Sequence, residues 1–229
     1  MKTLQQLPGV AVGTEGMTGL YVRGGGADEN LYLLDGNPVY HVNHLLGFFS
    51  AFNPDAIKNT RFYKGSFPAE YGGRLSSVVD VRMNDGNRQE YHGNISVGLL
   101  SARANLEGPI VKDRSSFNVS VRRTWLDLIT GTALAVVNKN SSIKDVFGYH
   151  FFDINAKLNH SFSDRSRAYL SFYMGQDAFR QGSKEKNGDS EDMFLWRWGN
   201  LIGSAGWNYV FGQKLFGNLM VGYSRFRSH

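Results

Sequence analysis

From Tyr91 onward the chain alternates apolar and polar residues with a period of two. Residues 152–159 do so without exception, and their apolar members are Phe152, Ile154, Ala156 and Leu158. The same alternation recurs in residues 117–125, where Arg123 interrupts it, and in residues 168–174 and 219–223. Neighbouring side chains of a strand point to opposite faces, so the pattern predicts strands with one apolar face and one polar face.

The predicted strands are long. Residues 151–162, at about 3.3 Å per residue, extend ~40 Å and, tilted by roughly 45°, cover close to the ~25 Å apolar band of an outer-membrane barrel. A strand of an ordinary soluble protein has only about 5 to 6 residues. Strand length therefore favours a membrane-spanning sheet.

The connections between the predicted strands alternate in length. Short turns are predicted at residues 111–115, 163–166 and 212–214, and long polar loops at residues 127–149 and 176–193. Transmembrane barrels have short turns on one rim and longer loops on the other. The spacing is therefore a second indication of a barrel, independent of the alternation.

The parity of the apolar residues changes inside residues 92–107. The apolar residues up to Leu99 are odd-numbered, whereas those from Leu100 to Leu106 are even-numbered. A single strand would need a bulge at this point. We predict instead two strands joined by a tight turn near Leu100 and Ser101.

Residues 1–86 follow a different pattern. Short apolar segments of strand length each end at a turn signal, such as Asp35 followed by Gly36, which predicts a small mixed domain of short strands. Short helical pieces are predicted at residues 3–7 and 53–57. The second has Asn53 as N-cap and Pro54 at the first helical position.

The composition agrees with a β-rich protein. Of 229 residues, 14% are aromatic and 27 are glycine, which favours strands and tight turns. There is no cysteine, so the chain can form neither a disulfide nor a thiolate metal site. No stretch reaches the roughly 18 to 20 apolar residues of a membrane-spanning helix, whereas barrel strands escape this criterion.

The charge pattern suggests few further partners. The formal net charge is +5, but Lys and Arg are scattered singly, so we predict no nucleic-acid partner. The first ten residues lack the apolar core of a secretory signal. If the protein is exported, we expect this chain to be an internal or mature piece.

A series of short motifs has a specific order and spacing. The motifs are LQQLPGV at residues 4–10, YVRGG at 21–25, LLDGNPV at 33–39, NPDAIK at 53–58, KG at 64–65 and AEYGGRLSSVV at 69–79. With these motifs, residues 1–86 resemble the plug domain of TonB-dependent outer-membrane receptors. Residues 91–229 resemble about seven first strands of the barrel of the same receptors.

The resemblance implies a fold and a location. The expected fold is an α+β plug domain followed by antiparallel β strands of an incomplete transmembrane β-barrel, mostly β, in the outer membrane of a Gram-negative bacterium. The whole barrel of the family has about 22 strands. The chain would then be truncated at its C-terminus and lack the upstream signal peptide and TonB box.

The resemblance also implies an activity and partners. The expected activity is energy-coupled uptake of a siderophore, cobalamin, glycan or peptide, driven by the TonB complex through the N-terminal box. Outer-membrane lipid is an expected partner, and a surface lipoprotein is a further candidate. We expect no cofactor, no metal and no covalent catalysis.

In a plug of this family, glycines provide sharp turns without side-chain bulk. The candidates for this role are Gly24, Gly25, Gly36, Gly72 and Gly73. A phosphate-binding loop is disfavoured at the triple glycine, because the following Asp28 and Glu29 would repel phosphate.

Three charged residues are candidates for ion pairs between plug and barrel: Arg23, Glu70 and Arg74. The alternative is that they are solvated surface charges, since exposed pairs contribute only ~0 to 1 kcal/mol.

Residues 40–44 are expected in a loop at the outer end of the plug. Tyr40, His41, Asn43 and His44 could face the incoming ligand, and an ordinary polar loop is the alternative. A zinc site at the two histidines lacks a third ligand at a recognisable spacing.

Four aromatic residues are candidates for the two membrane interfaces: Trp196, Trp198, Tyr209 and Phe211. The alternative for the tryptophans is stacking on a sugar.

Two other functions remain as competing hypotheses. A soluble all-β carbohydrate- or ligand-binding module would pack the apolar faces of its strands against each other. An enzyme using Asp28, Glu29, Asp35 and the two histidines has the least support, because no catalytic spacing stands out.

Overall fold

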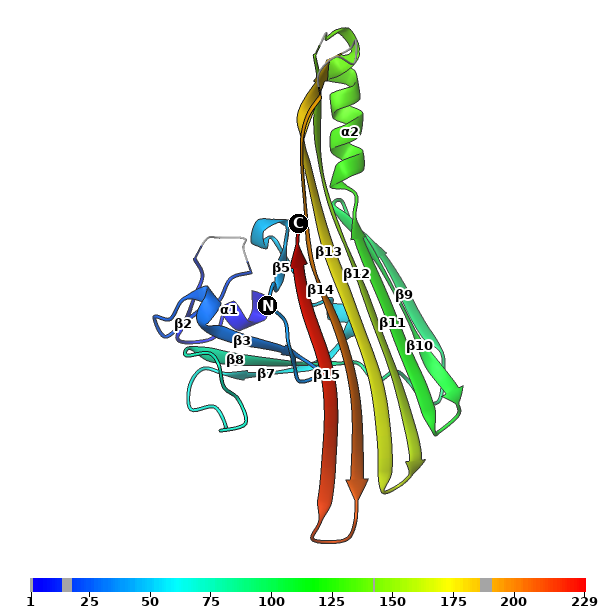
Figure 1. The fold of residues 1–229 in the computed structure, drawn as a ribbon. Coiled ribbons are helices and arrows are strands. Elements are labelled where there is room, and N and C mark those ends of the chain that lie inside the picture. The colour runs from blue at the N-terminus through cyan, green and yellow to red at the C-terminus, as the bar shows by residue number, and fades with distance from the viewer. Residues whose placement is uncertain (1, 14–17, 142, 186–190) are drawn as a thin grey trace.

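The computed structural model describes residues 2–13, 18–141, 143–185 and 191–229. It has two parts: a small N-terminal unit and a long, curved antiparallel sheet against whose concave side the unit lies (Figure 1). The fold class predicted from the sequence, a small mixed domain followed by antiparallel strands, is confirmed.

The N-terminal unit consists of short elements. Its helical turns are α1 (Lys2–Gln5), η1 (Ala27–Glu29), η2 (Leu45–Gly47) and η3 (Pro54–Ala56). Its strands are β1 (Val10–Ala11), β2 (Tyr21–Val22), β3 (Asn30–Leu34), β4 (Asn37–Pro38), β5 (Asn43–His44), β6 (Phe49–Ser50), β7 (Ile57–Tyr63) and β8 (Ser77–Met83). Four of the strands form a sheet in the order β4-β3-β8-β7, in which β3 is parallel to β8.

The predicted helical piece at residues 53–57 is confirmed as the turn η3. Asn53 is its N-cap, because its side-chain oxygen accepts a hydrogen bond from the backbone N–H of Asp55, and Pro54 takes the first position. The core of the unit lies where β3 and β8 meet the neighbouring loops. Its buried side chains include Leu20, Val22, Leu34, Val79, Val81 and Met83.

The second part is a sheet of seven strands, each paired with its neighbours in the sequence. The strands are β9 (His92–Val97), β10 (Ser101–Val111), β11 (Ser115–Thr124), β12 (Ile143–Ser163), β13 (Ser166–Glu185), β14 (Glu191–Val210) and β15 (Phe216–Ser228). The sheet is not closed, and β9 and β15 form its edges. The predicted hairpin at residues 92–107 is confirmed, since β9 and β10 pair as antiparallel neighbours across residues 98–100.

The two predicted long loops are largely regular structure, so that prediction was wrong. Residues 126–137 form helix α2 (Leu126–Val137), which is followed by η4 (Asn138–Asn140), and β12 begins at Ile143. The ladder between β12 and β13 continues up to the pair Ile143 and Glu185. Backbone pairing satisfies the N–H and C=O groups of a polar segment as well as of an apolar one, so polarity alone did not indicate a loop.

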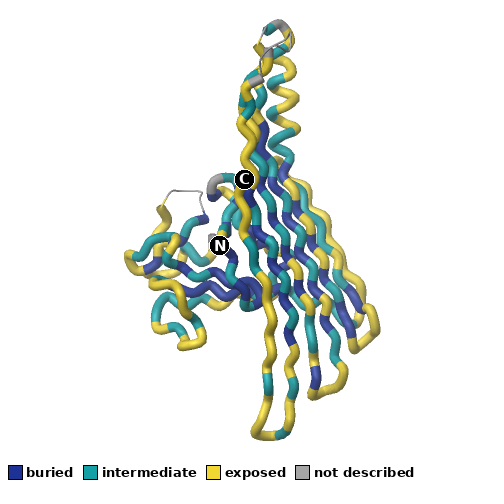
Figure 2. The backbone as a smooth tube through the Cα atoms, viewed as in Figure 1, coloured by how far each residue is buried: buried dark blue, intermediate teal, exposed yellow. Residues whose placement is uncertain are grey.

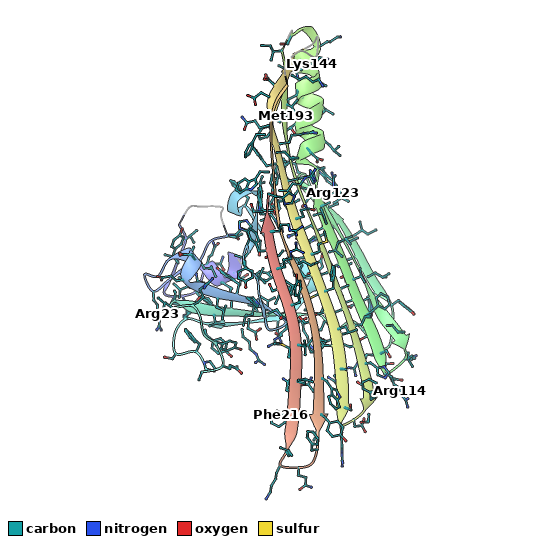
Figure 3. The ribbon with its side chains drawn as sticks, viewed as in Figure 1. Arg23, Arg114, Arg123, Lys144, Met193 and Phe216 are labelled. Atoms are coloured by element: carbon teal, nitrogen blue, oxygen red, sulfur yellow. The ribbon has the colours of Figure 1, made fainter. Side chains whose placement is uncertain are left out.

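Strands β12, β13 and β14 therefore rise above the rest of the sheet beside α2 (Figure 1). Figure 3 shows Met193 near the upper end of this extension and Phe216 near the lower end of β15. Within the described ranges, no helix has the length and apolar character needed to cross a membrane.

The two faces of the sheet have opposite character. On the concave face, polar side chains such as Asn118, Ser120, Asp153 and Asn155 are buried. On the convex face, apolar side chains such as Leu158 and Leu170 are exposed. Dark and pale segments consequently alternate along the central strands in Figure 2.

Candidate functional site

The N-terminal unit is held to the concave face by a group of buried charges. His44, at the end of β5, lies between two carboxylates of the sheet. Its Nε2 is 2.8 Å from Oδ1 of Asp153 on β12, and its Nδ1 is 2.7 Å from Oδ2 of Asp177 on β13. The exposed fractions of the two aspartate side chains are 0% and 1%, so water does not weaken these contacts.

The geometry requires both ring nitrogens of His44 to donate. An ionised carboxylate only accepts hydrogen bonds, so a ring that faces two carboxylates carries a proton on each nitrogen. The pKa of His44 is raised to about 9: burial by itself would lower it, and the attraction of Asp153 and Asp177 outweighs burial. His44 is therefore a cation at neutral pH.

Asp153 also binds an arginine of the sheet. Nε of Arg122, on β11, donates to Oδ2 of Asp153 at 2.7 Å, and the hydroxyl of Tyr173 donates to Oδ1 at 3.1 Å. Arg122 reaches the N-terminal unit as well, because its Nη2 donates to the carbonyl of Ser50 at 2.7 Å. Two cations, His44 and Arg122, thus balance two anions in the buried group.

Aromatic rings surround these charges. Phe151 stacks on the imidazole of His44, with ring centroids 4.2 Å apart and planes 6° apart. The hydroxyl of Tyr149 donates to Oδ1 of Asp177 and accepts the backbone N–H of Leu45. A low local dielectric strengthens such paired contacts and makes the loss of any one partner costly.

A second charged contact lies lower on the same strand. Nζ of Lys157 on β12 is 3.3 Å from Oδ1 of Asp35 and 3.1 Å from Oδ1 of Asp85, and it donates to the carbonyl of Met83 at 3.1 Å. Lys58 contacts the other oxygen of Asp85 at 2.6 Å. The pKa of Asp85 is lowered: burial by itself would raise it, and the two lysines outweigh burial.

Neutral hydrogen bonds complete the interface. Nδ2 of Asn53 donates to Oγ of Ser120 at 2.6 Å, and Nδ2 of Asn200 donates to the carbonyl of His41 at 2.7 Å. Asn37 donates to Ser204, and Ser224 donates to the carbonyl of Pro38 at 2.5 Å. Every strand from β11 to β15 therefore makes at least one polar contact with the N-terminal unit. On β12 and β13 these contacts are made by Lys157 and Asp177.

A pocket of about 410 Å³ lies beside the upper end of this interface. It is lined by His41, Asn43, Gly47, Trp196, Trp198, Phe226 and Ser228. The pKa of His41 is lowered, first by burial and to a smaller extent by the neighbouring charge of His44, against the opposing effect of Asp177. The N-terminal unit and two strands of the sheet build this pocket together.

Comparison with known proteins gives the family of the N-terminal unit. Residues 1–79 match the model of the TonB-dependent receptor plug domain. The chain carries a TonB-dependent receptor plug domain. No curated protein matches the chain by sequence.

Solved structures with the same fold cover the plug and the sheet together. The siderophore receptor PirA from Acinetobacter baumannii aligns with 99% of the chain at a TM-score of 0.53 and 16% identity. A variant of the ferric enterobactin receptor PfeA from Pseudomonas aeruginosa aligns with 96% of the chain at a TM-score of 0.50 and 16% identity. In each case the chain spans 45% of the length of the solved receptor.

The three residues predicted to pair plug and barrel are all exposed and lie away from the contacts described above. Among the described residues, Arg23, Glu70 and Arg74 form no ion pair with the sheet. Arg23 lies on the side of the plug remote from the sheet (Figure 3), and Nη1 of Arg74 donates to the carbonyl of Gly73. Their pairing role stays a prediction.

The predicted turn glycines fall into two groups. Gly24, Gly36 and Gly73 have φ between +81° and +83°, in the left-handed region that favours glycine. Gly25 and Gly72 do not, and a Cβ at Gly25 would contact Ser76 and Glu29.

The predicted ligand loop divides between the pocket and the buried charges. Tyr40 is exposed, His41 and Asn43 line the pocket, and His44 is buried in the charged group. Asn43 also accepts a hydrogen bond from the hydroxyl of Thr18. In the described part of the chain, no group of three or more acidic or histidine side chains is arranged to hold a metal ion.

The prediction of Trp198 and Trp196 as membrane-interface residues was wrong. The exposed fraction of Trp198 is 5%, and its ring lies 6.2 Å from that of His41 in the plug. The ring of Trp196 lies 4.5 Å from that of Trp198 and is tilted by 43° to it, so both tryptophans face the plug side. The reason is strand parity, because both share the even-numbered face of Asn200 and Ser204, which contact the plug.

Tyr209 lies on the opposite face of β14. Its ring is in contact with Trp207 at 5.6 Å and with Phe211 at 4.7 Å. The role of Tyr209 and Phe211 at a membrane interface stays a prediction, and Trp207 extends their row.

The sequence reading missed Arg122, Asp153, Lys157 and Asp177. A signal was present for Arg122, Asp153 and Lys157, since each is a charged residue on the polar face of an alternating strand, whereas Asp177 falls in the segment predicted as a loop. The position of their partners in the plug was not evident from the sequence.

Proposed function

We propose that this chain is the plug and the first wall of an outer-membrane receptor that takes up its ligand in a TonB-dependent, energy-coupled process. One observation carries the proposal: the sheet buries its polar face against the plug and exposes its apolar face. A soluble protein does the reverse, because water stabilises exposed polar groups and not exposed apolar ones. An apolar outer face beside a polar, filled interior is the arrangement of a membrane barrel.

The plug occludes the lumen in this proposal. Polar contacts with the sheet extend from His44 at the upper end to Asp85 at the lower end, and smaller apolar contacts, such as that of Phe49 with Phe151, lie among them. Polar contacts can be exchanged for contacts with water, whereas a large apolar interface would have to be exposed. A pull by the TonB complex on a segment that precedes the plug would therefore release the plug in steps.

The pocket beside His41 is the proposed ligand contact of the plug. It lies where residues 41–47 meet the upper parts of β14 and β15. Siderophore, cobalamin, glycan and peptide are the ligand classes to be tested.

The alternative of a soluble binding module is not favoured. It required the apolar faces of the strands to pack against each other. Instead, large apolar residues on the convex face are exposed, among them Ile95, Leu158, Leu170, Leu219 and Val221.

The test is an uptake and fractionation experiment on cells that carry the gene and on a deletion strain. We expect the protein in the outer-membrane fraction, and labelled ligand from one of the four classes to accumulate only in cells with the gene. Accumulation should stop when TonB is deleted or the proton gradient is dissipated. Recovery of the protein in a soluble fraction, or uptake that is indifferent to TonB, would refute the proposal.

A further inference from the structure

A row of aromatic side chains climbs the inner face of the sheet above the plug. We call it the aromatic strip; it consists of Phe147 on β12, Phe179 on β13, and Phe194, Trp196 and Trp198 on β14. The ring of Phe179 lies 5.6 Å from that of Phe147 and 6.2 Å from that of Phe194. Phe179 is also directly opposite Trp196 in the strand register, so the rings form one continuous surface.

The strip ends in the pocket at the top of the plug. Trp196 and Trp198 are members of both, and the ring of His41 lies between Trp198 at 6.2 Å and Phe226 at 5.9 Å. The strip therefore leads from the raised ends of β12, β13 and β14 to the plug.

At the lower end of the strip, Trp198 and Phe179 pack with the buried rings of Tyr149 and Phe151, but the upper rings, Phe194 and Trp196, belong neither to a packed core nor to the outer face of the sheet. The exposed fractions of Phe194 and Trp196 are 57% and 42%, although both are large rings. A core ring would be buried, and a ring in contact with lipid would point outward, as Trp207 does on the same strand. Exposed rings that are grouped on a concave face are typical of a ligand contact.

The charges around the strip decide the class of ligand. None of the seven residues lining the pocket is charged at neutral pH, because burial keeps the pKa of His41 low. Above the strip, Asp145 and Asp192 each lie opposite Ser183 in the register, on the same face as Phe147 and Phe194. The basic side chains Arg122 and Lys157 of the concave face lie nearer the plug and are paired with carboxylates, so the two acidic groups above the strip would repel an anionic ligand such as a ferric catecholate.

The remaining chemistry is that of a sugar. A pyranose ring has two apolar faces that stack on aromatic rings and a rim of hydroxyl groups that exchange hydrogen bonds with amides and hydroxyls. The pocket offers both kinds of contact, since the rings of Trp196, Trp198 and Phe226 line it together with the polar side chains of Asn43 and Ser228.

We propose that the aromatic strip and the pocket bind the pyranose rings of a neutral oligosaccharide. The pyranose rings of the ligand stack on the aromatic side chains of the strip and reach the plug at the pocket. This inference rests on the proposed function, because it requires the concave face to be the side that the ligand enters.

The test measures, by calorimetry, the binding of oligosaccharides to the full-length receptor in detergent micelles. The probes are maltohexaose, cellohexaose, xylohexaose and mannohexaose, with ferric enterobactin as the anionic comparison. We expect at least one oligosaccharide to bind and Trp196→Ala to weaken its binding by about tenfold or more, as for aromatic residues at the centre of an interface. Trp196→Phe, which keeps a stacking ring, should retain most of the affinity and shows that the site still folds.

Trp207→Ala is the matched control. Trp207 is the same residue type on the same strand with a similar exposed fraction, 44%, but lies on the outer face. Its loss should change the affinity less than about twofold, as for a residue outside the interface. Absence of binding to all four oligosaccharides, or unchanged binding by Trp196→Ala, would overturn the inference.

An uptake assay separates this inference from the proposed function. If the receptor takes up a siderophore or cobalamin in a TonB-dependent way and Trp196→Ala leaves that uptake unchanged, the oligosaccharide inference is refuted and the proposed receptor function stands. If the wild type shows no TonB-dependent uptake of any ligand class, both the oligosaccharide inference and the proposed function are refuted.

Discussion

Nε2 of His44 lies 2.8 Å from Oδ1 of Asp153, although 109 residues separate the two in the sequence. The contact joins a loop of the plug to the middle of the wall, and both side chains are buried. Since Asp177 contacts the other ring nitrogen, His44 links the plug to two neighbouring strands of the sheet, β12 and β13. Four of the consequences can be measured.

The first prediction concerns the loss of the imidazole. His44→Ala leaves Asp153 and Asp177 with one buried cation, Arg122, for two negative charges. Removing one partner of a buried ion pair costs about 3–5 kcal/mol, and we expect a loss of this size in the free energy of unfolding of the receptor in detergent. Hydrogen exchange of residues 43–50 should become faster.

Tyr40→Ala is the control for this variant. Tyr40 belongs to the same loop but is exposed, so its loss should change stability by no more than about 0.5 kcal/mol. Equal stability of His44→Ala and the wild type would show that the buried charges do not hold the plug.

The second prediction concerns pH. The pKa of His44 is about 9 in the folded protein and about 6.5 in an unfolded chain. A raised pKa stabilises the fold fully below the unfolded value, and the stabilisation is lost as the pH rises through the folded value. The stability difference between the wild type and His44→Ala should therefore shrink between pH 7 and pH 10. Denaturant unfolding of both proteins at pH 7, 8, 9 and 10 measures it, and a difference that stays constant contradicts the assignment.

The third prediction compares two lysines that contact one carboxylate. The exposed fraction of Lys157 is 6% and that of Lys58 is 53%, and both contact Asp85. Lys157→Met also leaves the buried carboxylate of Asp35 without its cation, so we expect a loss of several kcal/mol. Lys58→Met should cost no more than about 1 kcal/mol, because water screens an exposed pair. Similar unfolding midpoints for the two variants would contradict this distinction.

The fourth prediction concerns the space between the plug and β15. A Cβ at Gly222 would overlap the carboxamide of Asn37, whose side chain donates to Ser204. Gly222→Ala should displace Asn37 and destabilise the receptor by about 1–3 kcal/mol, as overpacking does. Gly203→Ala is the control, because no atom lies within 4 Å of the Cβ position there. Thermal unfolding of the two variants in detergent gives the comparison, and equal melting temperatures would argue against close contact.

Some of the candidate site could be read from the sequence before any coordinates. The alternation in residues 152–159 indicates which side of β12 is polar, whereas the location of residues 40–44 at the outer end of the plug stays a prediction. The tryptophans were misassigned because aromatic residues occur both at membrane interfaces and inside a lumen. The two positions, at a membrane interface or inside a lumen, are distinguished by residue parity along β14. Trp196 and Trp198 are even-numbered, as are Asn200 and Ser204, which contact the plug.

The extension of β12, β13 and β14 was also missed. Residues 176–185 and 191–193 contain many polar residues, and polar composition is equally compatible with a loop and with a paired strand in water. The partner strand decided the outcome, because the ladder supplies the hydrogen bonds that a loop would take from water.

The sequence by itself determined the two faces of residues 117–125, 152–159, 168–174 and 219–223, the hairpin at residues 92–107 and the turn at Asn53, because side-chain direction and capping depend only on neighbouring residues. Only the tertiary structure decided that His44 lies between Asp153 and Asp177 and that Lys157 contacts Asp35 and Asp85. It alone also decided that Trp196 and Trp198 lie on the plug side of β14. These contacts depend on which loop of one domain reaches which register of another, and no local pattern specifies a meeting between residues so far apart in the chain.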